Sequence, residues 1–237
     1  ADPLVLRQSA KPFILRRSKD EVAKDLPEMT EIEEVLQLTE PQAAAYKKAT
    51  RNPGASALQM FTTLRSITDL DNVTGSSAKV DRTIELIHQI LAQGDRMIVF
   101  SFWTDILLSL RRRLQENSSQ LTIYYLNADL SALERTELID TWRTDHRGVL
   151  LASGHIASEG LTLTEANYVI FLNLWWNPTL NRQARDRVNR IGQQKPTFAI
   201  SFRTAGTVED SISRLHHSKD SLEAMVVGWL EEQGRGN

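Results

Sequence analysis

Cysteine is absent from this chain of 237 residues, and its absence excludes several kinds of site at once. Without cysteine there is no disulfide framework, no thiolate metal site and no cysteine nucleophile. The five histidines are scattered and have no acidic partner at ligand spacing, so the sequence predicts no metal site. This composition fits an intracellular protein, which we expect in the nucleus of a eukaryote or in the cytoplasm of a bacterium.

Long apolar runs and a basic excess are missing as well. No run reaches the roughly 18 to 20 residues that a membrane-spanning helix requires, so we expect no membrane partner. The formal net charge is −2 and the pI is about 6.3. This balance excludes binding of nucleic acid by a general positive charge. Any contact with DNA must therefore be local.

The dipeptide Gly-Lys is the third absence. An ATPase that wraps phosphates in a glycine-rich loop needs Gly-Lys followed by Ser or Thr, together with an acidic pair for magnesium. Asp20 and Glu21 match such a pair by letter, but they follow Arg16, Arg17 and Lys19 instead of an apolar strand. We interpret them as the solvated start of a helix. The sequence therefore contains no complete site for ATP hydrolysis.

Short β-branched or aromatic runs alternate with helical patterns over most of the chain. The runs are typical of buried parallel strands and lie at residues 97–102, 121–126, 149–153, 168–172 and 198–202. Helices are expected at residues 78–93, 104–116, 131–143 and 180–190. Ser131, with Glu134 three residues later, opens the third helix as a capping box. This alternation predicts an α/β fold, an open parallel sheet with helices on both faces.

Other patterns flank this central part. Residues 30–39 indicate a strand and residues 41–49 and 57–68 indicate helices, before a Gly/Ser stretch at 72–77 that we interpret as a linker. Residues 207–230 have an amphipathic helical pattern that predicts packing back on the sheet. We expect a single lobe over residues 1–237. Its parts are an N-terminal arm (1–30), an α/β body with a helical segment to about residue 77 (31–204), and a C-terminal bracing helix and tail (205–237).

One basic segment carries the strongest functional pattern. At helical spacing Gln183, Arg187 and Arg190 project from one face, and Gly192 is expected to end the helix. A guanidinium is permanently charged and offers a planar fork of donors, which suits the oxygens of a transferring phosphoryl group. An apolar strand and an aromatic turn ending at Pro178 come directly before. Strand, turn and basic helix predict a phosphate-facing corner of the sheet.

A simpler interpretation is a solvated helix face. In that case Asp186 and Arg190 form an ordinary pair four residues apart, and the arginines have no ligand. An isolated arginine run would favour this interpretation. The strand and aromatic turn in front of the helix favour the phosphate site instead.

The same segment resembles a known family. Residues 183–193 read Gln-Ala-Arg-Asp-Arg-Val-Asn-Arg-Ile-Gly-Gln and follow Trp-Trp-Asn-Pro at 175–178. Together with segments 12–27, 97–104 and 154–164, in this order, they resemble the second RecA-like lobe of the Snf2 family, within superfamily 2 of helicase-like ATPases. The resemblance covers nearly the whole chain. It implies a RecA-like fold and, for the parent protein, ATP-driven translocation along double-stranded DNA in chromatin, other protein–DNA complexes or repair intermediates.

The resemblance also implies roles for individual residues. Arg187 and Arg190 match the arginine fingers that complete an ATP site across the cleft between two lobes, and Gln183 lies near the nucleotide. Gly160 lies beside the same site, and Glu159 puts a negative charge near the phosphates. The residues implied near DNA, where phosphate contacts position the duplex without reading its sequence, are Ser101, Ser153 and Trp176, the last as a DNA or interlobe contact.

Three positions depart from the family pattern. Glu159 ends a loop, 157–159, in which the family usually has glycine and threonine, so this loop is less adaptable. Asn173 stands in place of the usual Asp, and Asn189 in place of the usual His. These changes put the coupling of ATP turnover in question, but they leave both arginines in place.

The resemblance divides the expected site between two lobes. ATP and Mg²⁺ are held mainly by an N-terminal RecA-like lobe that this sequence lacks, so we expect the isolated chain to be inactive. The implied partners are double-stranded DNA, that lobe and DNA-bound protein complexes. Two alternatives stay open: a degenerate, non-catalytic lobe that binds DNA or a partner, and a doubly wound metabolic enzyme. The latter ranks last because no Gly-x-Gly-x-x-Gly follows its first strand.

Overall fold

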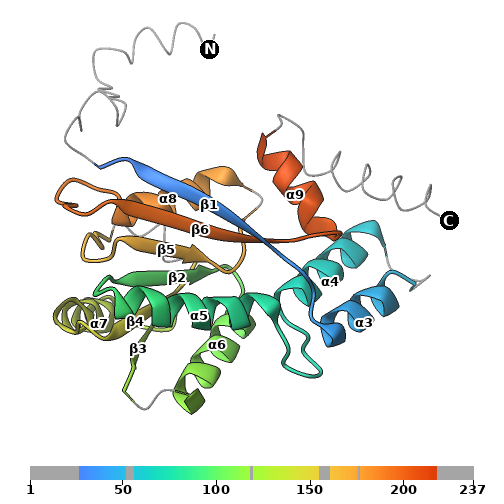
Figure 1. The fold of residues 1–237 in the computed structure, drawn as a ribbon, viewed down its shortest axis with the longest axis horizontal. Helices are drawn as coiled ribbons and strands as arrows, with labels where there is room; N and C mark the ends of the chain where they lie inside the picture. The colour runs from blue at the N-terminus through green and yellow to red at the C-terminus, as the bar shows by residue number, and fades with distance from the viewer. Residues whose placement is uncertain (1–26, 52–55, 118–119, 155–160, 176, 218–237) are drawn as a thin grey trace, which may run out of the picture.

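A computed structural model describes residues 27–51, 56–117, 120–154, 161–175 and 177–217 (Figure 1). Its centre is a sheet of six strands in the order β1-β6-β5-β2-β4-β3, and every pair of neighbours is parallel. The strands are β1 (Met29–Leu36), β2 (Met97–Ser101), β3 (Thr122–Leu126), β4 (Gly148–Ser153), β5 (Tyr168–Phe171) and β6 (Thr197–Thr204). The predicted α/β fold with an open parallel sheet is therefore confirmed.

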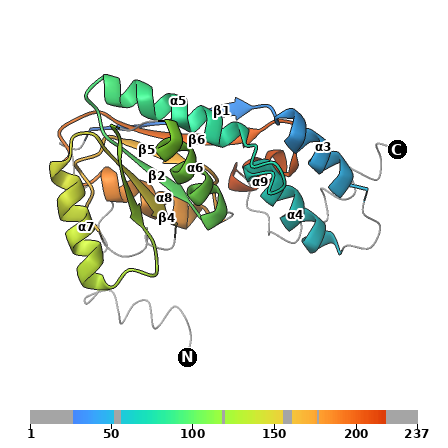
Figure 2. The same ribbon diagram turned by 90° about the horizontal axis from the view of Figure 1, so that it is seen from below.

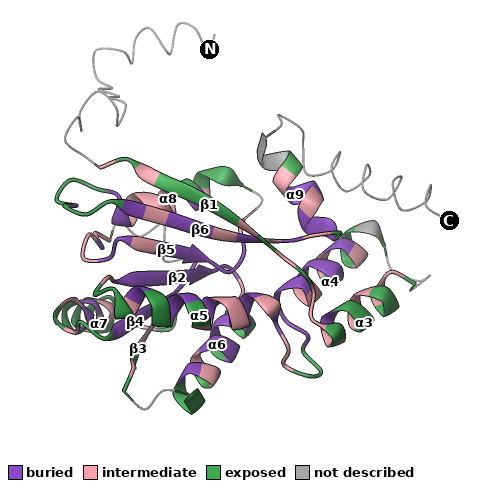
Figure 3. Cartoon of the chain, viewed as in Figure 1, coloured by how far each residue is buried: buried purple, intermediate pink, exposed green. Residues whose placement is uncertain are grey.

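Burial along the strands explains their sequence patterns. Every side chain of β2 and β4 is buried, so these central strands are continuous apolar runs instead of alternating ones. The edge strand β1 is mostly exposed (Figure 3), and it carries three glutamates, Glu31, Glu33 and Glu34. Charged side chains on an edge strand oppose pairing with a foreign strand.

Helices cover both faces of the sheet, as the alternation predicts. On one face α5 (Ala78–Ala92) and α6 (Thr104–Asn117) bury Ile87 and Leu107 against the strands. On the other face α7 (Ala132–Thr144) and α8 (Pro178–Val188) bury Trp142 and Val188. The predicted capping box at the start of α7 is present, with Ser131 and Glu134 each bonded to the backbone of the other. Two apolar clusters, one on each face, form the core.

Two helices between β1 and β2, and one after β6, form a separate layer. Helices α3 (Glu40–Ala49) and α4 (Ala57–Asp69) extend beyond the end of the sheet, and α9 (Val208–His217) packs on α4 (Figures 1 and 2). A capping box opens α3 at Thr39 and another opens α4 at Ser56. The expected N-terminal arm up to residue 26 and the chain after residue 217 lie outside the described residues.

The predicted linker at residues 72–77 is instead a closed turn. Asp71 pairs with Ser76 as an isolated bridge, and the Asp71 carboxylate accepts hydrogen bonds from Thr74 Oγ1 and Val73 N. Ser77 then caps α5 and donates to the carbonyl of Asp69 at 2.6 Å. Gly/Ser composition pointed to flexibility, but the short polar side chains are used for local hydrogen bonds that fix α4 to α5.

Candidate nucleotide-binding site

Helix α8 presents the predicted arginine segment. Asn177 caps its start by accepting from Thr179 N at 3.0 Å, and Pro178 occupies the first turn, where no amide donor is needed. Asn181, Ala184 and Val188 are buried at three- and four-residue spacing and fix which side faces the sheet. The remaining positions, including half-buried Gln183 and Arg187, face outward.

The prediction that this helix extends to Arg190 and is ended by Gly192 is wrong. The helix ends at Val188, with Asn189 at φ −85° and ψ 78°, so Arg190 lies beyond the helix and Gly192, at φ 106°, does not end it. Arg190 therefore does not continue the face of Gln183 and Arg187. Its side chain is exposed and donates from Nη1 to Thr162 Oγ1 at 3.0 Å. A side chain from a distant segment, and not helical periodicity, orients this guanidinium.

The last turn of α8 lies at the end of the sheet where β5 begins. A crossover helix runs antiparallel to its strands, so α8 starts where β5 ends and finishes near the segment that enters β5. There Leu163 N donates to the Arg187 carbonyl at 2.9 Å, and Gln193 Nε2 donates to the Ala166 carbonyl at 2.8 Å. The predicted phosphate-facing corner therefore falls at the last turn of α8 and residues 161–166.

Two positive charges meet at this corner. Partial burial, and then the nearby charge of Arg190, lower the pKa of Arg187 below its ordinary value, while Asp186 opposes the shift. Two adjacent guanidiniums repel each other, and a multiply charged anion relieves that repulsion. The neighbouring Arg185 has another role, because it forms an ion pair with Glu31 of β1. Gly160 and Glu159, predicted beside this corner, lie outside the described residues.

The two serines predicted near DNA end neighbouring strands, β2 and β4. Ser101 is fully buried, and its hydroxyl donates to the Trp103 carbonyl and accepts from Asn173 Nδ2, both at 2.9 Å. In this arrangement the Ser101 hydroxyl reaches no solvent. Ser153 is 4% exposed, and its hydroxyl has no hydrogen-bond partner among the described residues. Trp176 lies outside them.

A cluster of buried polar side chains lies next to the ends of β2 and β5, and the sequence analysis did not predict it as part of a site. Asn173 donates from Nδ2 to Asp69 Oδ2 at 2.9 Å and accepts from Phe102 N at 3.0 Å, which joins the ends of β2 and β5 to α4. Lys79 and Arg65 belong to the same region and are almost wholly buried. The departure of Asn173 from the family pattern was the one indication of this cluster in the sequence.

Comparisons with known proteins give consistent matches. The family model of the helicase conserved C-terminal domain matches residues 78–192, and that of the SNF2-related domain matches residues 4–94. The Bacillus subtilis (strain 168) protein YwqA, whose name describes an ATP-dependent helicase/translocase, is 30% identical over 96% of this chain and 27% of its own length. The chain thus spans about a quarter of the length of this relative.

Solved structures agree with the fold. The C-terminal part of the Fun30 ATPase domain matches 84% of this chain and 92% of its own, with a TM-score of 0.73 and 18% identity, which supports the fold alone. The Sulfolobus solfataricus SWI2/SNF2 ATPase core in complex with double-stranded DNA matches 89% of this chain and 49% of its own, with a TM-score of 0.66 and 29% identity. The predicted RecA-like architecture is therefore confirmed.

The described residues contain neither a helix suited to a membrane nor a cluster of metal ligands. None of their helices combines the length and apolar character needed to cross a bilayer. No group of three or more His, Asp or Glu side chains among them is arranged to hold a metal ion.

Proposed function

Because the chain belongs to the Snf2 family of helicase-like ATPases, we propose that it is the second motor lobe of an ATP-dependent translocase acting on double-stranded DNA. In this proposal the lobe supplies arginine fingers to an ATP site that a first lobe completes. Relatives named as ATP-dependent helicases and a structural neighbour solved with double-stranded DNA support it. DNA-bound protein complexes are the substrates that we propose for the whole protein.

The observation that carries the proposal is the arginine pair at the end of α8. Arg187 and Arg190 come from one segment, and Thr162 fixes Arg190 from a second segment. Two forked, permanent charges near each other suit the oxygens of a triphosphate, whose charge grows on the transferring group during hydrolysis. Gln183, one turn before Arg187, is the proposed neighbour of the nucleotide. Mg²⁺ would be held by the first lobe, because the described residues offer no group of acidic ligands for it.

The proposed DNA contacts lie where strands β2 and β4 end, at the opposite end of the strands from the arginine pair. Ser153 ends β4 with an enclosed hydroxyl that has no partner among the described residues, so a small rearrangement would make it available to a phosphate. Ser101 acts indirectly in this proposal, by fixing the backbone of Trp103 from β2. We keep Trp176, Gly160 and Glu159 as proposed contacts by resemblance alone. Backbone contacts of this kind suit movement along DNA of any sequence.

The first experiment removes one finger from a protein that contains both lobes. We expect Arg187→Ala to lower DNA-stimulated ATP turnover by roughly 10³-fold or more, because a finger acts mainly in the transition state. The matched control is Arg182→Ala, which removes an exposed arginine from the same helix and should leave turnover within about twofold.

The outcomes separate the motor from the non-catalytic alternative. Retained turnover in Arg187→Ala contradicts the finger role and returns α8 to an ordinary solvated helix. If the unmodified protein binds DNA but hydrolyses no ATP, the non-catalytic lobe is the correct function instead.

A further inference from the structure

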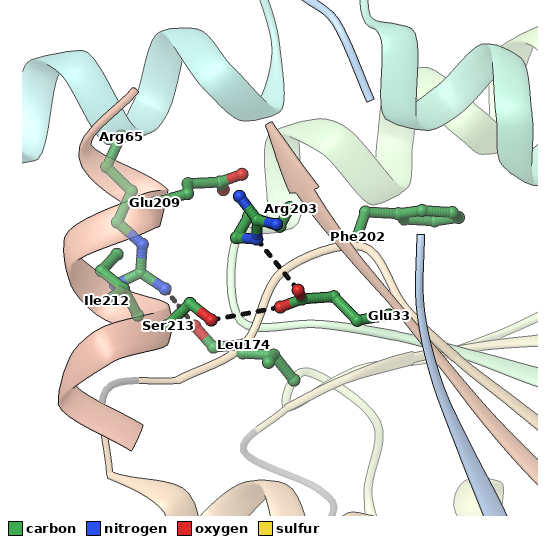
Figure 4. A pocket seen from close by; sticks show the side chains of 8 residues that line it. All are labelled: Glu33, Arg65, Leu174, Phe202, Arg203, Glu209, Ile212 and Ser213. Carbon is green, nitrogen blue, oxygen red and sulfur yellow. Dashed lines mark hydrogen bonds and ion pairs between the residues drawn. The ribbon is translucent and has the colours of Figure 1, made fainter. Parts of the chain in front are cut away.

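Arg65 of α4 is an unusual core residue. It is 1% exposed, although its side chain is long and permanently charged. Its guanidinium donates from Nη2 to the carbonyl of Leu174, beside a small cavity of about 20 Å³ (Figure 4). The guanidinium carbon also lies 5.9 Å from the ring centroids of both Trp103 and Trp175. These distances suit cation–π contact with both rings.

These contacts join two loops through a third element. Trp103 follows β2, whereas Leu174 and Trp175 follow β5. Phe102, next to Trp103, packs on Trp175 with the ring centroids 4.9 Å apart. A single side chain of α4 therefore fixes both loops where they leave the sheet.

The loop after β5 is in turn locked to α8. Trp175 N donates to Asn181 Oδ1 and Asn181 Nδ2 donates back to the Trp175 carbonyl, both at 2.8 Å. Asn181 is 2% exposed and lies on the buried face of α8, two turns before Arg187. A continuous set of contacts therefore runs from Arg65 through Trp175 and Asn181 to the helix that carries Arg187.

We propose that Arg65 is a positioning residue, which sets the placement of α8 and thereby of the arginine pair at its end. The inference rests on the proposed ATPase function for its effect on turnover, but its structural part does not. Arg65 touches neither nucleotide nor DNA in this proposal. It acts through the aromatic loop, so its loss displaces Arg187 without removing it.

The energetics favour positioning over simple filling of the core. Burying a guanidinium is costly, and an apolar side chain of similar volume usually fills a core site at equal or better stability. What an apolar residue lacks is the guanidinium, which donates to the Leu174 carbonyl and makes cation–π contact with two indoles. Glu209 and Asp69 lie near enough to balance the charge.

The test compares Arg65→Met and Arg65→Lys with Leu114→Ala. Leu114 is a fully buried residue of α6, away from the aromatic loop, so its truncation destabilises the lobe by about 2–5 kcal/mol without touching the proposed path. Arg65→Met keeps an unbranched side chain, but it loses the donor fork and also the cation that Asp69 and Glu209 help to balance. Arg65→Lys keeps the charge and a single donor nitrogen, so it serves as the conservative variant and protects against a failure of the Met variant to fold.

The first readout is hydrogen exchange of backbone amides in this chain. We expect Arg65→Met to speed exchange in α8 at least tenfold relative to α6, Arg65→Lys to have an intermediate effect, and Leu114→Ala to have the opposite pattern. Unchanged exchange in α8 for both Arg65 variants overturns the proposal, whatever the activity of the protein is.

The second readout is ATP turnover in a protein that contains both lobes. We expect Arg65→Met to lower kcat by roughly tenfold to a hundredfold while KM for ATP changes less than about threefold, since a displaced catalytic group affects the chemical step more than binding. Equal kcat values for Arg65→Met and Leu114→Ala, both measured below their unfolding temperatures, contradict positioning. If the unmodified protein has no ATP turnover, the proposed function is refuted. The hydrogen-exchange result then decides by itself whether Arg65 positions α8.

Discussion

At the scale of single residues, the structure depends on charges placed inside the core. Lys79 is fully buried and pairs with Asp69 at 2.6 Å and with Glu209. Burial by itself lowers the pKa of the Lys79 ammonium, but the two carboxylates outweigh it and raise that pKa above its ordinary value. With Arg65 nearby, the cluster contains two cations and two anions. This balance lets four charged groups share an interior site.

Removal of one member should leave an uncompensated charge. We expect Lys79→Met to lower the free energy of unfolding by about 3–5 kcal/mol, because Asp69 and Glu209 stay buried without their shared partner. Arg112→Ala is the control, since Arg112 and Glu116 form an exposed pair 3.9 Å apart whose loss should cost less than about 0.5 kcal/mol. Urea unfolding of both variants measures the difference, and equal costs contradict the expectation.

Asn173 gives a second test at this scale. Its amide donates to Asp69, so Asn173→Asp places two carboxylates at 2.9 Å and should cost about 2–5 kcal/mol. The double variant Asp69→Asn with Asn173→Asp exchanges donor and acceptor, and it should recover at least half of that loss. A double-mutant cycle measured by urea unfolding reports the coupling. Simple addition of the two single costs would refute the reciprocal pair.

At the scale of elements, the sequence predicted the strands and helices, because these follow from local periodicity. It missed the features that depend on contacts between distant residues. Every expected strand and helix of the described residues is present within a few residues, because apolar runs and caps such as Ser131 are local features. The end of α8 was wrong because Leu163 and Gln193, not Gly192, satisfy the carbonyls of its last turn. The role of Arg65 was missed because its partners are far away along the chain.

One contact between elements gives a prediction about pH. Tyr46 of α3 accepts a hydrogen bond from Val208 N at 2.9 Å and so caps the start of α9. Burial raises the pKa of Tyr46 from 10.0 to about 12, and nearby Glu209 and Asp210 add to the shift. A raised pKa means that the folded state favours the neutral phenol. Its stabilising contribution is complete below pH 10 and is lost as the pH rises to about 12.

The measurement compares the chain with Tyr46→Phe. The difference in their free energies of unfolding should be constant between pH 7 and pH 9, and then shrink by up to about 2–3 kcal/mol by pH 12. Buried tyrosines and lysines common to both proteins cancel in this difference. A difference that stays constant to pH 12 would show that the Tyr46 hydroxyl does not titrate with the proposed shift.

At the scale of the whole molecule, the proposed ATP site is incomplete. The arginine corner supplies positive charge only, and the sequence has no Gly-Lys phosphate loop. We therefore expect the isolated chain to release no phosphate from ATP above the blank, with or without double-stranded DNA, in a malachite-green assay. Addition of DNA tests whether the absence of activity reflects a missing activator. DNA-stimulated release by the chain alone would contradict the divided site.

The pairing of β1 with β6 has a consequence for biosynthesis. Among the described strands β1 is synthesised first and β6 last, so β1 gains its neighbour only after the other four strands have been made. Until then β1 must wait unpaired, and pairings between such remote segments form slowly. Glu31, Glu33 and Glu34 keep the waiting strand soluble and discourage premature association with other nascent chains.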